Sequence, residues 1–149
     1  MKDPKRIPAD PEYLQSLGRA VYNFTYLEWG IVWTIAKLSS DGFASVPRGE
    51  TARAIAKALT NAIDTTNPKL SASLRIRLVK LDEQFRKAIS ERNKLFHAHP
   101  YTAKDGSQQL GGGGLEWPIE NIRSASIRFE ELAIECNAIF HGPLKKERS

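Results

Sequence analysis

The sequence predicts an all-α protein: a four-helix bundle of the up-and-down type, with a short β-hairpin-like insertion before the last helix. Apolar residues recur every three or four positions over four separate segments, which is the period of a helix face packed on a core. Proline, glycine and asparagine separate these segments. Because 149 residues, 41% of them hydrophobic, are enough for one core, we expect residues 1–149 to form a single domain.

The first helix is expected from Pro11 to about Ser39, with Asp10 as its N-cap. Its apolar stripe contains one charged residue and consists of Leu14, Leu17, Val21, Phe24, Glu28, Ile31, Ile35 and Leu38. An aromatic stripe lies opposite and consists of Tyr22, Tyr26, Trp29 and Trp33. A helix that is apolar on two faces is buried on both, either deep in the bundle or between the bundle and a second copy of the chain. We favour the second position, which predicts a homodimer.

Two helices are expected in the middle of the chain. The second helix runs from about residue 47 or 50 to residue 63, with an inward face of Ala52, Ile55, Ala56, Leu59 and Ile63. The third runs from about residue 69 to residue 97 or a little beyond, where Pro100 stops it.

The remaining residues predict the insertion and the last helix. Residues 101–117 favour two short extended segments joined by a tight turn at 104–107. The glycines at 111–114 are expected to form a flexible connection. The last helix is expected from about residue 118 to residue 140. Its inward stripe contains the single cysteine, Cys136, which we expect to be a small core residue and not a nucleophile.

A cation interrupts the apolar stripe of the third helix, which consists of Leu74, Leu78, Leu81, Phe85, Ala88, Arg92 and Leu95. A buried guanidinium needs a partner, water or a site. Glu28 is likewise the lone charge on the stripe of the first helix. We therefore expect Glu28 and Arg92 to be partners, in a salt bridge or a hydrogen bond. A structural ion pair without a catalytic role stays open beside a functional one.

The third helix ends in the segment Arg92-Asn93-Lys94-Leu95-Phe96-His97. This segment resembles the arginine, four to six residues, histidine motif of the HEPN superfamily, with Asn93 as the polar residue that commonly follows the arginine. Leu27 and Glu28 also resemble the first helix of that superfamily. The resemblance covers nearly the whole chain. It implies a HEPN-like helical domain that dimerises with its two motifs facing one another.

The resemblance also implies a function, that of a metal-independent endoribonuclease. Several members of the superfamily are toxins or antiphage effectors, so RNA and an antitoxin or operon partner protein are the expected partners. Members paired with small nucleotidyltransferase antitoxins have a tyrosine two residues after the motif histidine. This chain has His99 there, and the nearest tyrosine is Tyr101.

The implied reaction starts when a ribose 2′-hydroxyl attacks the adjacent phosphorus, and it leaves a cyclic phosphate and a 5′-hydroxyl end. His97 suits acid and base work, because an imidazole titrates near neutrality. Arg92 offers a charged fork for the phosphoryl oxygens, and Asn93 is one helical turn from His97 and can orient the ring or the phosphate. We expect Glu28 and His99 to support these residues.

Arg92 is rotated by about 140° from His97 on a helix. Two opposed motifs would let each histidine meet the other chain's arginine. The net charge of +5 permits a polyanionic partner. Lys94, Arg86 and Lys87 lie on the motif helix, where they are expected to contact phosphates.

Several other classes are not expected. His97 and His99 fall on different sides of a helix with no nearby acid or cysteine, so no metal and no cofactor is predicted. The glycines at 111–114 lack the Gly-Lys-Ser/Thr ending of a phosphate loop. No apolar run is long enough for a membrane helix and residues 1–11 have no apolar signal core, so we expect a cytoplasmic protein.

Two alternatives to the ribonuclease remain. One is a non-catalytic HEPN-like module that binds nucleotide, RNA or a protein. The other is a structural partner subunit of a two-component operon. An intact motif favours the enzyme.

Overall fold

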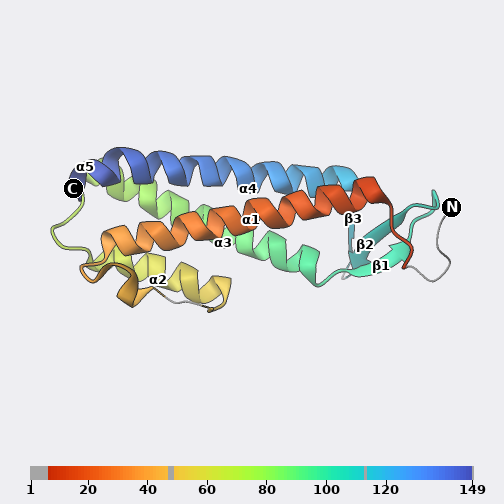
Figure 1. The fold of residues 1–149 in the computed structure, drawn as a ribbon, viewed down its shortest axis with the longest axis horizontal. Coiled ribbons are helices and arrows are strands. Elements are labelled where there is room, and N and C mark those ends of the chain that lie inside the picture. The colour runs from red at the N-terminus through yellow and green to blue at the C-terminus, as the bar shows by residue number, and fades with distance from the viewer. Residues whose placement is uncertain (1–6, 47–48, 113, 149) are drawn as a thin grey trace.

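The computed structural model describes residues 7–46, 49–112 and 114–148. Most of these residues are helical (Figure 1), as predicted. The four long helices are α1 (Pro11–Leu38), α2 (Ala52–Thr65), α3 (Ala72–Phe96) and α4 (Ile119–Ile139). A 3₁₀ turn η1 (Gly42–Ser45) follows α1, and α4 continues into a π-helical turn η2 (Phe140–Leu144) and a short helix α5 (Lys145–Glu147). Within these ranges, none of the helices combines the length and the apolar character needed to cross a membrane.

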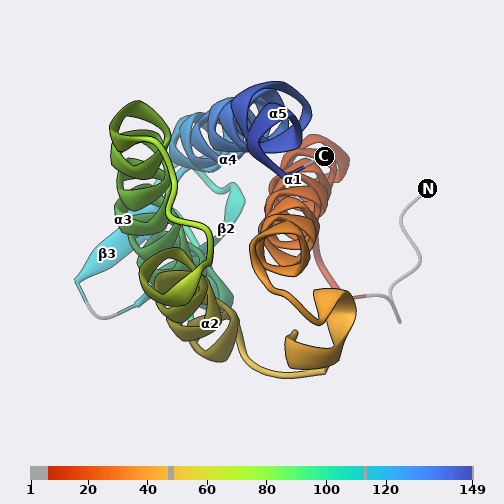
Figure 2. The ribbon, with the colours of Figure 1, turned by 90° about the vertical axis from the view of Figure 1, so that its left-hand side faces the viewer.

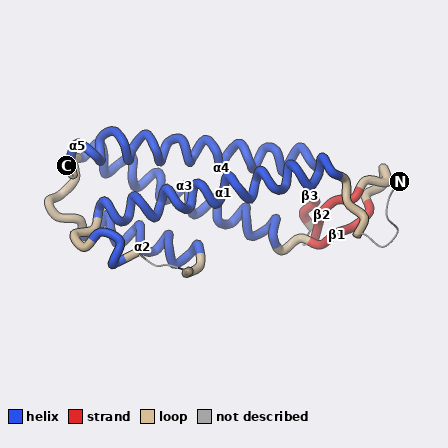
Figure 3. The backbone as a smooth tube through the Cα atoms, in the orientation of Figure 1, coloured by secondary structure: helices blue, strands red, loops and turns tan. Residues whose placement is uncertain are grey.

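A small antiparallel sheet is inserted between α3 and α4 (Figure 3). Its three strands lie in the order β1 (His99–Thr102), β2 (Gln108–Gly112) and β3 (Leu115–Trp117). The prediction of a hairpin was therefore wrong, because Gly111 and Gly112, expected to be part of a flexible connection, are the last residues of β2, and Gly114 comes just before a third strand, β3. Gly112 and Gly114 have φ angles of 139° and 80°, which glycine adopts without the steric cost of a side chain.

The directions of the helices differ from an up-and-down order. In Figure 1, α1, α2 and α4 all run away from the sheet, and α3 alone runs toward it. The last residues of α1 and α2 lie together, since the Thr66 hydroxyl donates a hydrogen bond of 2.9 Å to the Leu38 carbonyl. The first residue of α2 therefore lies part of the way back along the bundle, and α2 runs in the same direction as α1 (Figure 1). Viewed end-on, the four helices surround a common core (Figure 2).

The core contains most of the predicted stripes. The inward faces expected for α2 and for Cys136 on α4 are confirmed. The stripe predicted for α1 is only partly right, because Leu14 and Val21 are 52% and 38% exposed while Tyr13 and Ala20 are buried in their place. Both sets have helical spacing, and the neighbouring elements decide which of them is covered.

Polar contacts fasten the first turn of α1 to the sheet. The Tyr13 hydroxyl donates to the Trp117 carbonyl at 2.6 Å and accepts from the Leu110 amide at 2.9 Å. Asp10 stands at the N-cap position, as predicted, but its carboxylate makes no capping hydrogen bond and accepts from the Gln108 amide at 3.1 Å. The sheet is thus held at the end of the bundle where α3 finishes.

Candidate functional site

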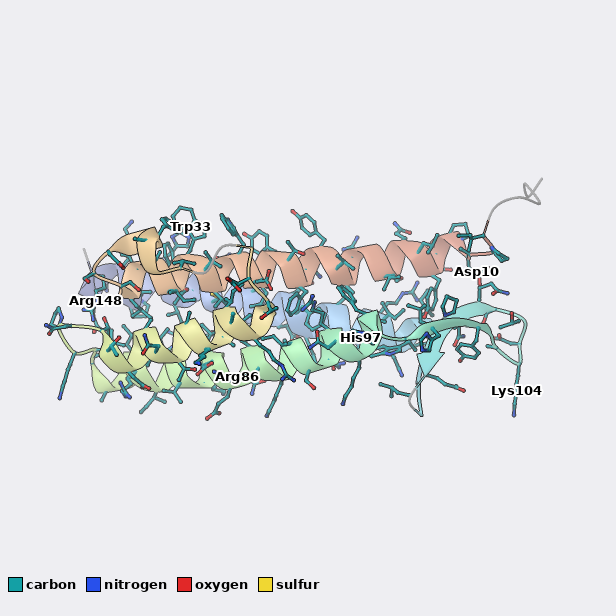
Figure 4. The ribbon with its side chains drawn as sticks, turned by 90° about the horizontal axis from the view of Figure 1, so that it is seen from below. Asp10, Trp33, Arg86, His97, Lys104 and Arg148 are labelled. Carbon is teal, nitrogen blue, oxygen red and sulfur yellow. The ribbon has the colours of Figure 1, made fainter. Side chains whose placement is uncertain are left out.

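His97 is the residue that ends α3. Its backbone amide donates to the Asn93 carbonyl at 3.0 Å, and its φ and ψ of −92° and 0° turn the chain out of the helix toward β1. Figure 4 shows His97 where the helix meets the sheet. The imidazole is exposed and has no hydrogen-bonding partner among the residues that the structure describes. It is therefore accessible to a substrate.

The Arg92 side chain is half-buried between aromatic rings. Its guanidinium carbon lies 5.0 Å from the centroid of the Phe24 ring and 5.0 Å from that of the Phe96 ring. One guanidinium nitrogen, Nη1, donates to Asn93 Oδ1 at 3.3 Å. A cation over a ring face is attracted by the ring quadrupole. The rings and the amide thus fix where the charge of Arg92 lies.

The expected contact between Glu28 and Arg92 is not formed. In the described part of the chain, neither a hydrogen bond nor an ion pair joins them. Burial raises the pKa of the Glu28 carboxyl, and the charge of Arg92 lowers it by less. The two groups therefore interact only at a distance, as separate charges.

Glu28 and Arg92 do not meet because α1 and α3 each turn a face to the core that differs slightly from the predicted one. Leu27 takes the core position on α1 and is fully buried, which leaves Glu28 at the edge of the buried face. On α3 the same happens with Ile89, which is buried where Ala88 was expected, so that Arg92 also lies at an edge. Neither charge needs a direct partner at such a position, because water reaches it.

The three cations predicted to contact phosphate have different surroundings. Arg86 forms an ion pair of 3.1 Å with Asp82 and donates to the Thr60 hydroxyl at 2.6 Å, so it joins α3 to α2. Figure 4 shows Arg86 on the α2 side of the bundle. Lys87 and Lys94 are exposed and make no ion pair with any described residue. These two lysines are the predicted cations that stay available to a polyanion.

His99 lies outside the helix, on the first strand of the sheet. The register pairs it with Gly111, and Gly111 with Glu116, so these three positions form one row across the strands. Sequence reasoning missed this grouping, because it depends on the third strand. Among the described residues, no three His, Cys, Asp or Glu side chains are grouped so that they could hold a metal ion.

The aromatic stripe of α1 is on the surface. Its most open members are Tyr22 and Trp29, which are 69% and 60% exposed, while Trp33 packs edge-on against Phe43 at 4.8 Å. Figure 4 shows Trp33 on the outer side of α1. The alternative that this stripe lies deep in the bundle is therefore excluded. The homodimer stays a prediction.

Cys136 is buried in the core, and its thiol lies 3.5 Å from the Thr34 hydroxyl. Burial raises the pKa of this thiol to about 11. A thiol is a poor nucleophile when it is not ionised. Cys136 is therefore a structural residue, as the sequence predicts.

No protein-family model, no curated protein and no solved structure matches this chain. This protein is therefore characterised by its own fold and site. It is a mostly helical protein with a three-stranded sheet at one end of the bundle. At the junction of bundle and sheet lie an exposed histidine and an arginine held between aromatic rings.

Proposed function

We propose that this chain is a metal-independent endoribonuclease of the HEPN type that acts as a homodimer. The observation that supports this proposal is the contrast between two side chains at the end of α3, one held in place and one exposed. Arg92 has a position set by Phe24, Phe96 and Asn93, whereas His97 is open to solvent without a competing partner. A cation at a fixed position can stabilise the charge that forms on the phosphorane, and an accessible imidazole can transfer protons, so the two together suit metal-independent cleavage of an RNA phosphodiester.

In the proposed reaction, the imidazole of His97 removes the proton of a ribose 2′-hydroxyl. The 2′-oxygen forms a bond to the adjacent phosphorus, and the bond from phosphorus to the 5′-oxygen breaks. A water molecule gives a proton to the leaving 5′-oxygen. The products are a 2′,3′-cyclic phosphate and a 5′-hydroxyl, and Arg92 stabilises the extra negative charge of the phosphorane between them.

The homodimer is proposed because of the aromatic stripe of α1. Large aromatic side chains that share one exposed face mark an interaction surface more often than scattered ones do. The two-fold pairing of such a face is self-complementary. Because the stripe is on the outer side of α1, away from α3 (Figure 4), such pairing would cover the aromatic rings and leave each His97 open to substrate.

The direct test is cleavage of a fluorescent single-stranded RNA in the presence of EDTA. Wild type is expected to cleave this RNA. His97→Ala is expected to cleave it at least about 100-fold more slowly, because a general acid or base typically accelerates a reaction by at least that factor. His141→Ala is the matched control, because His141 is an exposed histidine on η2, at the far end of the bundle from His97.

The outcomes separate the candidate functions. Cleavage that survives in His97→Ala, or that disappears with the chelator, contradicts the mechanism. RNA binding without cleavage at any pH would instead support the non-catalytic binding module.

A further inference from the structure

A cleft lies on the outer face of the sheet, two residues along the chain from His97. It is lined by residues of all three strands and of the turn between β2 and β3, among them His99, Tyr101, Gly111 and Glu116. Its volume is about 580 Å³, which falls in the size range of small-molecule sites. The cleft is open to solvent, and three of its side chains can take part in hydrogen bonds.

The strand register explains why these side chains share one face. Directly paired residues of antiparallel strands point to the same side of a sheet. His99, Gly111 and Glu116 therefore point one way, while the paired residues Leu110 and Trp117 point the other way, toward the hydrophobic core. Two strand spacings, about 10 Å, separate the Cα atoms of His99 and Glu116.

The floor of the cleft is an aromatic ring. A Cβ atom added to Gly111 would lie 2.8 Å from Cε1 of Tyr101, so the Tyr101 ring lies directly on this glycine. Any larger residue at position 111 would push the ring away. The glycine thus allows the ring to lie low between His99 on one side and Glu116 on the other.

The carboxylate of Glu116 is close to this ring. Burial raises the pKa of the Tyr101 hydroxyl, and the nearby negative charge of Glu116 raises it further. The Tyr101 hydroxyl donates a hydrogen bond of 3.2 Å to Gln109 Oε1, which leaves the Glu116 carboxylate without this donor. The Glu116 side chain is exposed and makes no ion pair with any described residue. Its acceptor oxygens are therefore available beside a flat aromatic surface.

These features fit one kind of RNA base. Unpaired bases stack on aromatic side chains and are read on their Watson–Crick edges. Guanine presents two adjacent donors there, N1–H and the 2-amino group, which match the two oxygens of a carboxylate. Adenine and cytosine present an acceptor nitrogen beside their amino group, and uracil presents a single N–H between two carbonyls. A carboxylate therefore favours guanine over the other three bases.

We propose that this cleft binds a guanine base of single-stranded RNA, stacked on Tyr101 and hydrogen-bonded to Glu116, next to the phosphodiester bond that His97 cleaves. The position of the cut rests on the proposed function, whereas guanine binding does not. The Cα atoms of His97 and His99 can be at most about 7 Å apart. A base in the cleft would thus place a neighbouring phosphate of the same strand at His97.

The binding test uses free mononucleotides and the full chain. Titration followed by calorimetry is expected to show GMP bound at least about tenfold more tightly than AMP, the usual worth of a bidentate pair. IMP, which keeps N1–H and lacks the 2-amino group, should lie between them. Glu116→Gln should remove the preference, and Glu120→Gln, at an exposed position in the first turn of α4, is the matched control that should keep it.

Because Glu116 is exposed, its substitution is expected to leave the fold intact, and the far-ultraviolet circular dichroism of both variants checks this. Equal affinity for GMP and AMP, or a preference that survives Glu116→Gln, overturns the proposal. Tyr101→Leu supplies a second variant, expected to weaken binding of GMP and AMP alike through lost stacking.

Mapping of the cleavage products separates this inference from the proposed function. On an RNA of mixed sequence, wild type should cut next to guanosines and Glu116→Gln should cut without that preference. Cutting by the wild type without guanosine preference overturns the inference and leaves the ribonuclease intact. If the wild type cuts no RNA, the proposed function fails, and the GMP titration still decides whether the cleft recognises guanine.

Discussion

The guanidinium carbon of Arg92 lies 5.0 Å from the centroid of the Phe24 ring. Phe24 is buried and packs in turn against Phe129 at 5.3 Å and Phe85 at 6.2 Å. The aromatic core of the bundle therefore extends without interruption to the charged group of the candidate site. Arg92 is positioned by packing, and the acid expected to hold it, Glu28, acts only at a distance.

The exposed ring beside Arg92 offers a test of this positioning. Phe96→Leu should leave stability almost unchanged, since Phe96 is 46% exposed, but it removes one of the two ring faces beside the guanidinium. A cation–π contact worth about 0.5–1 kcal/mol corresponds to a loss of about two- to fivefold in RNA cleavage rate. Ile76→Ala, at an exposed position near the start of the same helix, is the control and should cleave normally. Equal rates for Phe96→Leu and wild type would show that the ring has no such role.

The position of Glu28 predicts a stability that depends on pH. Because burial raises the Glu28 pKa, the folded state disfavours the carboxylate, and this cost appears as the pH rises through the folded-state pKa. Glu28→Gln should therefore match wild type at pH values below the ordinary glutamate pKa and be more stable at pH 7. The gain should not exceed about 1 kcal/mol, because solvent screens a half-buried charge. Urea unfolding at both pH values measures it, and a variant less stable than wild type at pH 7 would restore the direct ion pair.

Asp82 is expected to be a major polar contributor to the α2–α3 contact. It is 9% exposed, and it accepts from the Thr60 hydroxyl at 2.6 Å and from Arg86 at 3.1 Å. Asp82→Ala removes the charged acceptor that Thr60 and Arg86 share and should lower the free energy of unfolding by about 2 kcal/mol. Asp64→Ala breaks the exposed Asp64–Arg75 pair and should cost under about 1 kcal/mol. Similar losses in the two variants would refute the special role of Asp82.

The hydroxyl of Tyr13 should determine how firmly the sheet is attached to α1. Tyr13→Phe removes the acceptor of the Leu110 amide and the donor to the Trp117 carbonyl, and it should cost about 1–3 kcal/mol. Hydrogen exchange at the Leu110 amide should become faster. Tyr22→Phe, at an exposed position of the same helix, is the control and should leave exchange as it was. An unchanged rate at Leu110 in Tyr13→Phe would mean that the strand is held by other contacts.

The aromatic stripe of α1 predicts the oligomeric state. Trp29 is 60% exposed, so Trp29→Glu should leave the monomer fold intact and place a charge in the proposed two-fold interface. Sedimentation velocity at micromolar concentrations should show a dimer for wild type and a monomer for this variant. Ile76→Glu introduces the same charge at an exposed position on α3 and should remain dimeric. A wild-type monomer throughout this range would contradict the proposed homodimer.

Part of the site could be predicted from the chain alone. The place of Arg92, Asn93 and His97 in the last turn of α3 follows from the apolar period of that helix and from Pro100. The cleft on the sheet could not be predicted, because it needs the third strand. A run of glycines carries no apolar alternation, so its strand character at Gly111 and Gly112 depends on partners elsewhere in the chain.

The sequence by itself determined where the four long helices lie, since the period of apolar residues and the positions of proline act locally. It also determined that Cys136 belongs to the core. Only the tertiary structure decided which of two equally regular stripes of α1 is buried, Leu14 and Val21 or Tyr13 and Ala20. That choice sets Leu27 in the core and leaves Glu28 at its edge, apart from Arg92. Neighbouring positions on a helix differ by only about 100° of rotation, and the helices and the sheet that cover α1 select between them.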